Sequence, residues 1–266
     1  MTFSLTNIRH LLIDLDGVLY RGNAALPGAH GFTGWLRDRD IAFRLVTNNS
    51  TLTPRQYVEK LAGMGIQVEA GEIFTSALAV NLYLEGAEAR GERALLIGEA
   101  GLHDAAARAG LDIVTERPAD WVILGLDRHA TYHDFAVAAL AIRDGARLLA
   151  SNADASFPTE QGLVPGAGAL LALLATATGV TPTIVGKPEP LMLELAIRQM
   201  GGTLTDTAML GDRLDTDIEA ANRLGIGSIM VLTGVSTESD LAGCRWQPDL
   251  VVSGLPELER RWQKAA

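Results

Sequence analysis

The sequence is poor in cysteine and carries no obvious export segment. Cys244 is the single cysteine among 266 residues, so no disulfide can form within the chain. The N-terminal stretch MTFSLTNIRH lacks the apolar run and the cleavage site of a secretory signal peptide. Because disulfides and signal peptides are typical of secreted chains, these two absences predict a cytoplasmic protein.

Positive charge and long apolar runs are also scarce. The chain has 22 Lys and Arg residues against 32 Asp and Glu residues, a net charge of -10. A protein that binds nucleic acid or an anionic membrane needs a basic face, so we expect neither partner. The longest apolar stretches, such as GALLALLATATG from Gly168, are too short to span a bilayer. An acidic chain that binds an anion needs local help from a lysine, backbone N–H groups or a metal ion.

What the chain does have is enough apolar material for a core, at 48% of its residues. Short β-like apolar runs alternate with longer helical patterns along the whole sequence. HLLIDLDG from His10 and IAFRLVTNN from Ile41 are predicted strands, and HGFTGWLRDRD between them is a predicted helix. This alternation predicts an α/β fold with a mainly parallel sheet. No stretch rich in Pro, Gly and Ser marks a linker between domains, so the sequence pattern alone does not locate a domain boundary.

Polar side chains gather where the predicted strands end. Parallel sheets bind ligands outside the carboxyl ends of their strands, so these side chains would converge on one site if their strands are neighbours. They are Asp14 and Asp16; Thr47, Asn48 and Asn49; Lys187; and Asp212 with Asp215 and Asp217.

Such a convergence would favour phosphoryl chemistry. Three carboxylates near one point repel each other, and Mg²⁺ is the hard cation that would relieve this repulsion. A lysine would balance the remaining charge, and a hydroxyl with backbone amides could hold phosphate oxygens. A carboxylate beside the metal could attack phosphorus and form an aspartyl-phosphate. A second aspartate two residues on could protonate the leaving oxygen and later activate water.

Four motifs carry a family resemblance. DLDGVLY at 14–20, TNN at 47–49, GKPEP at 186–190 and GDRLDTD at 211–217 resemble the ordered motifs of haloacid dehalogenase (HAD) superfamily phosphatases. Together they look like the NagD-like, or 4-nitrophenylphosphatase-like, branch. The resemblance implies a Rossmann-like parallel-sheet core with a large α/β cap inserted between the second and third motifs. We therefore expect core segments at 1–81 and 184–266 and a cap at 82–183.

The resemblance also implies roles in the reaction. Asp14 would be the nucleophile, and Asp16 would be the general acid and base. Thr47 would bind the transferring phosphoryl group, and Lys187 would hold the charges of the nucleophile and the phosphate. The phosphate-binding set would comprise Thr47, Asn48, Asn49 and Lys187.

A Mg²⁺ site follows from the same resemblance. Asp14, the backbone carbonyl of Asp16, and Asp212 would coordinate the ion. Asp217 would lie outside these ligands and orient Lys187 or a metal-bound water. Asp215 is interpreted as an acid at a helix start, where the helix dipole stabilises it.

The function expected from this pattern is Mg²⁺-dependent hydrolysis of a small phosphomonoester through an aspartyl-phosphate. Two alternatives stay open. A phosphotransferase or mutase would pass the phosphoryl group to another hydroxyl. A receiver-type module would hold an aspartyl-phosphate without turnover, although the acid two residues after Asp14 suits discharge of that intermediate. The partner would be a small phosphorylated metabolite, and the resemblance implies a homodimer formed through the cap.

Overall fold

The computed structural model describes residues 3–159 and 161–265, which fold into two compact α/β units. We call them the first unit and the second unit and treat each by itself. No helix in the described part of the chain is long and apolar enough to cross a membrane. The first unit comprises Met1–Thr47, Pro54–Phe74 and Lys187–Ala266, and the second comprises Asn48–Thr53 and Thr75–Gly186.

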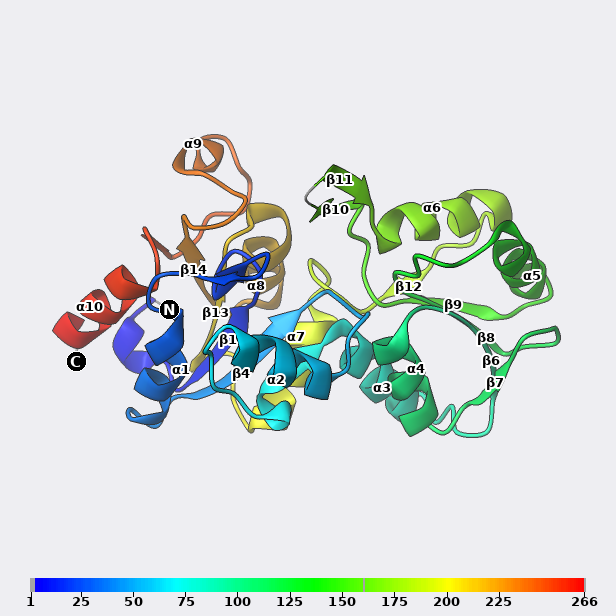
Figure 1. Cartoon of the computed structure of the whole chain (residues 1–266), viewed down its shortest axis with the longest axis horizontal. Coiled ribbons are helices and arrows are strands. Elements are labelled where there is room, and N and C mark those ends of the chain that lie inside the picture. The colour runs from blue at the N-terminus through cyan, green and yellow to red at the C-terminus, as the bar shows by residue number, and fades with distance from the viewer. Residues whose placement is uncertain (1–2, 160, 266) are drawn as a thin grey trace. The chain divides into compact units, whose positions relative to one another are not determined.

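A six-stranded sheet forms the centre of the first unit, in the order β15-β14-β13-β1-β4-β5. β1 lies between β13 and β4 and is parallel to both, as Figure 1 shows. β13, β14 and β15 continue the parallel pairing. The strands are β1 (His10–Asp14), β4 (Ala42–Thr47), β5 (Ile73–Thr75), β13 (Thr207–Gly211), β14 (Gly227–Val231) and β15 (Leu250–Val252).

The apolar run of β1 explains both its place in the sheet and the position of Asp14. Leu11, Leu12 and Ile13 are fully buried, as expected for a parallel strand that is covered on both faces. Burial of each side chain stabilises the fold by about 1.5–3 kcal/mol. Asp14 ends this strand, and Thr47 ends the parallel strand beside it. Both residues therefore lie at the carboxyl edge of the sheet.

Helices complete the first unit. α1 and α10 meet through the rings of Trp35 and Trp262, whose centroids are 5.6 Å apart, and α7 contacts β1 and β4. A short hairpin, β2 (Tyr20–Arg21) with β3 (Ala24–Ala25), follows β1. The helices are α1 (Ala29–Arg37), α2 (Pro54–Gly63), α7 (Leu191–Met200), α8 (Glu219–Leu224), α9 (Glu238–Leu241) and α10 (Leu255–Ala265), with 3-10 turns η1 (Leu5–Asn7) and η2 (Ala70–Glu72) and a π-helical turn η3 (Leu214–Ile218).

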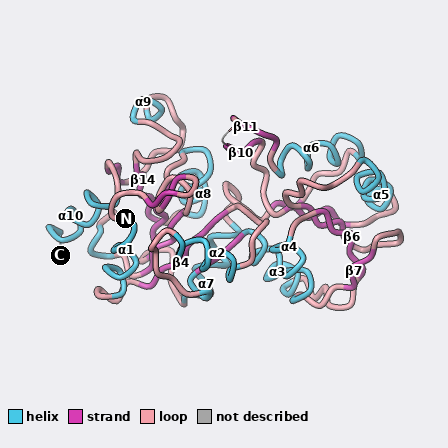
Figure 2. The backbone as a smooth tube through the Cα atoms, viewed as in Figure 1, coloured by secondary structure: helices cyan, strands magenta, loops and turns pink. Residues whose placement is uncertain are grey.

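The second unit has its own five-stranded parallel sheet, in the order β12-β9-β8-β6-β7. Figure 2 marks its strands and the helices that cover them. α5 and α6 pack on the apolar side chains of β6, β8 and β9, and Tyr83 of α3 contacts Trp121 of β8. The elements are β6 (Arg93–Ile97), β7 (Asp112–Val114), β8 (Trp121–Leu124), β9 (Arg147–Ala150) and β12 (Thr183–Ile184); α3 (Ser76–Gly86), α4 (Ala100–Arg108), α5 (Tyr132–Arg143) and α6 (Ala167–Thr178); and the hairpin β10 (Ser156–Thr159) with β11 (Gly162–Pro165).

Candidate active site

Lys187 joins two carboxylates in the interior of the first unit. Its Nζ lies 2.6 Å from Oδ1 of Asp14 and 2.6 Å from Oδ1 of Asp217. The Lys187 side chain is only 3% exposed, and a buried charge is costly unless it is paired. Burial alone would lower the pKa of Lys187, but Asp14 and Asp217 outweigh that effect and raise it above its ordinary value. The ammonium is therefore positively charged at neutral pH.

The charge on Asp14 depends on its neighbours. Burial raises the pKa of Asp14 well above its ordinary value, and the negative charges of Asp217 and Asp212 act in the same direction. Lys187 opposes this rise. The carboxylate form of Asp14 is thus stabilised by nearby positive charge, and an additional cation would stabilise it further.

Asp212 follows β13, and Asp217 lies in the π-helical turn η3. The wide turn, in which Ile218 N donates to Arg213 O at 3.1 Å, brings Asp217 back towards the strand end. Oδ2 of Asp217 accepts hydrogen bonds from the backbone N–H groups of Asp212 and Arg213, both at 3.2 Å. Oδ2 of Asp212 accepts one from Val235 N at 2.7 Å. Burial, followed by the charge of Asp217, raises the pKa of Asp212 to about 7.

Two glycines press closely on Asp212. A Cβ added at Gly17 would lie 2.4 Å from Asp212 Oδ2, and one added at Gly234 would lie 1.7 Å from the same atom. Gly17 also has φ +83°, a left-handed conformation that other residues seldom adopt. The glycine after Asp16 is therefore required both by the turn and by the space that Asp212 occupies.

Asp16 follows Asp14 by two residues and is exposed, although the residues on either side of it in the turn after β1 are buried. Partial burial of its carboxyl group raises its pKa, and Lys60 and then Arg21 oppose the rise. The turn is held by a hydrogen bond from Gly17 N to Tyr20 O at 2.7 Å. Of the two acids of the DLDG motif, Asp16 is the more exposed, whereas the Asp14 side chain is 14% exposed.

Thr47 is held by a residue that sequence reasoning did not identify. Its side chain is hydrogen-bonded to Tyr57 of α2, and Tyr57 is 1% exposed. Burial raises the pKa of Tyr57, and the bond to Thr47 opposes that rise. Tyr57 and Lys60 are three residues apart on α2, so both side chains lie on the same side of this helix. Their spacing in the sequence predicts that they share one face of a helix. Their contacts with Thr47 and Tyr20 can be seen only in the folded structure.

Asn48 and Asn49 belong to the second unit. The Asn48 side chain donates to both carboxylate oxygens of Asp154, each at 3.2 Å. The backbone carbonyl of Asn48 accepts a hydrogen bond from Asn152 Nδ2 at 2.7 Å. Oδ1 of Asn49 accepts from the backbone N–H of Thr51 at 2.9 Å. The contacts described for these two side chains thus lie within the second unit, and their part in phosphate binding stays a prediction.

The carboxylates of the first unit fit a divalent cation. Asp14, Asp212 and Asp217 each offer an oxygen, and these three oxygens lie within 4.8 Å of one another. Both oxygens of Asp217 accept hydrogen bonds, which suits positioning better than coordination. Within residues 3–159 and 161–265, nothing donates a hydrogen bond to Oδ2 of Asp14 or Oδ1 of Asp212. The lone pairs of Asp212 Oδ1 are therefore available to a hard cation, and Asp14 Oδ2 is available to a substrate.

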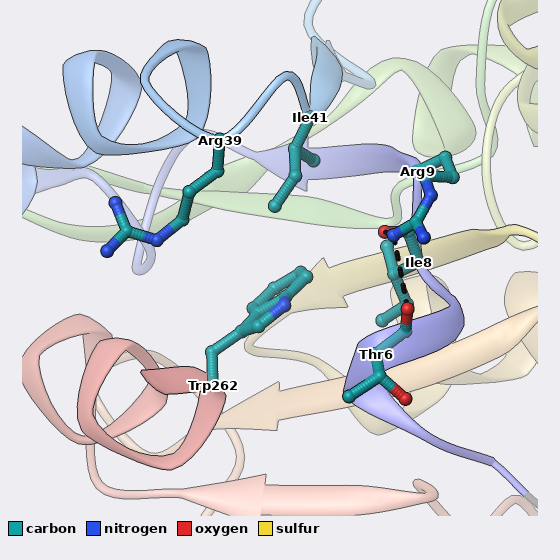
Figure 3. A pocket seen from close by; sticks show the side chains of 6 residues that line it. All are labelled: Thr6, Ile8, Arg9, Arg39, Ile41 and Trp262. Carbon is teal, nitrogen blue, oxygen red and sulfur yellow. Dashed lines mark hydrogen bonds between the residues drawn. The ribbon is translucent and has the colours of Figure 1, made fainter. Parts of the chain in front are cut away.

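A separate cavity lies at the other end of the same strands. Its volume is about 330 Å³, and Figure 3 shows Arg9 donating a hydrogen bond to the Thr6 carbonyl at its wall. Apart from Trp262 of α10, its lining residues shortly precede β1 or β4, whereas Asp14 and Thr47 end those strands. The cavity is therefore distinct from the acidic centre. It is lined by Thr6, Ile8, Arg9, Arg39, Ile41 and Trp262.

Comparisons with known proteins agree with the motifs. Residues 11–112 match the family model of haloacid dehalogenase-like hydrolases, and residues 184–258 match a second, HAD-hydrolase-like model. The acid sugar phosphatase of Staphylococcus aureus (strain USA300) is 41% identical over 253 residues, which cover 95% of this chain and 97% of that protein.

Two solved structures share the fold along nearly the whole chain. The 4-nitrophenylphosphatase of Thermotoga maritima superposes with a TM-score of 0.91 and 34% identity. The match covers 96% of this chain and 98% of the Thermotoga chain. The glycerol phosphate phosphatase of Mycobacterium tuberculosis, crystallised in complex with calcium, superposes with a TM-score of 0.89 and 36% identity. The match covers 96% of this chain and 75% of the mycobacterial chain. The resemblance predicted from the four motifs is confirmed: this chain belongs to the haloacid dehalogenase-like hydrolases, and it is a phosphomonoester hydrolase of their NagD-like, 4-nitrophenylphosphatase branch.

Proposed function

We propose that the protein hydrolyses a small phosphomonoester in a Mg²⁺-dependent reaction that passes through an aspartyl-phosphate on Asp14. One observation carries the proposal. Lys187 holds one oxygen of Asp14, while the other oxygen, Oδ2, receives no hydrogen bond from the described residues. A carboxylate fixed by one oxygen and open at the other is suited to attack phosphorus.

The first half-reaction forms the intermediate. Oδ2 of Asp14 attacks the phosphorus atom, a new P–O bond forms, and the bond from phosphorus to the ester oxygen breaks. Asp16 gives its proton to that oxygen, so the product leaves as an alcohol. Asp16 suits this role because it is exposed and lies two residues after the nucleophile, where a leaving group would have access.

The second half-reaction discharges the intermediate. Asp16, now ionised, takes a proton from a water molecule as that water attacks the phosphorus. The P–O bond to Asp14 breaks, inorganic phosphate leaves, and Asp14 is again a carboxylate. Thr47, Asn48, Asn49 and Lys187 are the proposed donors to the phosphate oxygens in both halves, because charge on those oxygens grows during transfer.

The proposed metal ligands are Asp14, the backbone carbonyl of Asp16, and Asp212. When bound, Mg²⁺ would supply positive charge against the transferring phosphoryl group. Asp217 would hold Lys187 and the backbone after Asp212 in place. The mycobacterial relative was crystallised in complex with calcium, which is also a hard cation, and Mg²⁺ is the cation that usually binds beside a substrate phosphate.

The substrate class follows from the relatives. They are named acid sugar phosphatase, 4-nitrophenylphosphatase and glycerol phosphate phosphatase, and these names support a small phosphate ester as the substrate. We propose that residues 82–183 act as a cap that surrounds the leaving group and excludes water, and that two chains associate through it. Light scattering of the intact chain and of a chain without residues 82–183 tests the dimer.

The deciding experiment is a screen of small esters with Mg²⁺. Sugar phosphates, glycerol phosphate, nucleotides, pyridoxal phosphate and 4-nitrophenyl phosphate are compared by released phosphate and kcat/KM. Phosphate release in water without an acceptor alcohol supports hydrolysis. Transfer that occurs only when an alcohol is supplied supports a phosphotransferase instead. Acid quenching with a ³²P-labelled ester should trap label on the protein, and Asp14→Asn should lose that label.

A further inference from the structure

The acidic centre poses a charge problem for an anionic substrate. Four carboxylates lie in or beside it, from Asp14, Asp16, Asp212 and Asp217. Lys187, the buried cation, is already paired with two of them. With Asp16 protonated, as the first half-reaction requires, Lys187 and one divalent ion would only neutralise the other three carboxylates, and the whole chain carries -10. A phosphomonoester dianion would therefore gain no net attraction unless further positive charge lies nearby.

Lys60 is placed to supply that charge. It lies on α2, three residues after Tyr57, and its Nζ is 4.2 Å from the centroid of the Tyr20 ring. Within the described residues, no carboxylate oxygen lies within 4.0 Å of this ammonium, so no ion pair neutralises it. Of the cations that act on the Asp16 carboxyl group, Lys60 has the largest effect and Arg21 the next.

The Tyr20 ring fixes Lys60 relative to the reaction centre. Tyr20 is 3% exposed, and its backbone pairs with Asp16 while its carbonyl accepts from Gly17 N at 2.7 Å. A cation over an aromatic face is attracted by the ring's electron density. The platform that holds the ammonium is thus part of the same turn that carries Asp16.

Arg21, the other cation near Asp16, is held by hydrogen bonds to the backbone. The Arg21 guanidinium donates hydrogen bonds to the backbone carbonyls of Thr233 and Gly234. Those bonds fasten the hairpin after β1 to the loop after β14. Arg21 therefore has a structural use for its donors, whereas Lys60 has an aromatic face and no carboxylate partner among the described residues.

We propose that Lys60, held on the Tyr20 ring beside Asp16, attracts the dianionic phosphate ester to the acidic centre. This inference rests on the proposed function, because it assigns the electrostatic recognition of the same substrate. Lys60 acts through its charge and is not one of the groups that make or break bonds. Charges in a partly buried site are screened less than charges on the open surface, so one ammonium can have a measurable effect.

The test compares three variants with the wild type in the presence of Mg²⁺. Lys60→Met keeps most of the side-chain length over Tyr20 but removes the charge, and Lys60→Arg keeps the charge. Lys264→Met is the matched control, because it removes the same charge from the exposed end of α10. For Lys60→Met we expect kcat/KM to fall about 10-fold, at the low end of electrostatic effects on association. The loss should appear mainly as a higher KM.

Two further readouts separate charge from packing. The decrease of kcat/KM with added NaCl should be shallower in Lys60→Met than in the wild type, because less attraction remains to be screened. The binding constant of inorganic phosphate, measured by calorimetry with Mg²⁺, should weaken by a similar factor. Lys60→Arg should restore most of each value, and Lys264→Met should match the wild type.

Several results would overturn the proposal. One is an unchanged phosphate affinity and salt dependence in Lys60→Met. Another is equal impairment of Lys60→Arg and Lys60→Met together with a lowered Tm, which would indicate packing on Tyr20. The phosphate titration does not require turnover, so it tests Lys60 even if no ester is hydrolysed. Absence of ester hydrolysis by the wild type would count against the proposed function alone.

Discussion

The Nζ atom of Lys187 lies 2.6 Å from Oδ1 of Asp14, although 173 residues separate them in the chain. The second carboxylate on this ammonium, Asp217, lies 2.6 Å away and comes from a different turn. Residues from β1, from the segment after β12 and from η3 thus share one buried charge. The order of the site is therefore coupled to the packing of the first unit's central strands.

Asp14→Asn should abolish steady-state phosphate release. An amide oxygen is a poor nucleophile and a weaker metal ligand, and the substitution also removes one partner of Lys187. The measurement is phosphate release over hours, with unfolding followed by circular dichroism to show that the variant is folded. Near-normal turnover by a folded Asp14→Asn would rule out the covalent route through this residue.

Asp16→Asn should slow hydrolysis by roughly 10²- to 10⁴-fold, the usual contribution of general acid–base catalysis. The rate of the first half-reaction should fall less with 4-nitrophenyl phosphate than with an alkyl phosphate, because nitrophenolate leaves without a proton. Single-turnover rates of protein labelling with the two esters provide the comparison. Equal losses for both would argue against proton donation by Asp16.

Removal of metal should stop the reaction, and Mg²⁺ should restore it. Asp212→Asn should raise the Mg²⁺ concentration needed for half-maximal rate by about 10- to 100-fold, as for the loss of a group that supports a metal site. Asp215→Asn is the matched control, since Asp215 is exposed and pairs with Arg213 instead of joining the cluster. Full activity of the wild type after EDTA treatment would contradict the assignment of these carboxylates.

Lys187→Met should destabilise the protein as well as inactivate it. The substitution leaves Asp14 and Asp217 facing each other without their shared cation, and breaking a buried ion pair costs about 3–5 kcal/mol. Urea denaturation in EDTA gives the free energy of unfolding. Arg198→Met, which breaks an exposed pair with Glu194, should change it by less than about 1 kcal/mol. Equal stability of Lys187→Met and the wild type would mean that water reaches these carboxylates.

Sequence periodicity predicted the buried strands and the longer helices. The apolar run Leu11–Ile13 indicated a buried strand, and the helix predicted for HGFTGWLRDRD corresponds to α1, Ala29–Arg37. β7, β2 and β3 were not predicted, because strands of two or three residues with exposed positions show no period. α10 is also absent from the predicted elements, although Leu255, Leu258 and Trp262 recur at helical spacing and form its buried face.

The residues of the site also fall into those that the sequence predicted and those that it did not. The rule that ligands bind at the carboxyl ends of parallel strands was enough to select Asp14, Lys187, Asp212 and Asp217, which the structure brings together. It could not select Tyr57 or Lys60. Their contacts with Thr47 and Tyr20 depend on how α2 lies beside β4 and on the hairpin after β1, and no motif records either.

The crowding of Asp212 by Gly17 and Gly234 limits how this enzyme can be redesigned. Even an alanine at either position would displace the carboxylate, so both sites are closed to substitution in any library that keeps the metal ligand where it is. Lys60 and Tyr20 offer more freedom, because their contact is between side chains. Substrate preference should therefore be easier to alter on the α2 side of the centre than on the Asp212 side.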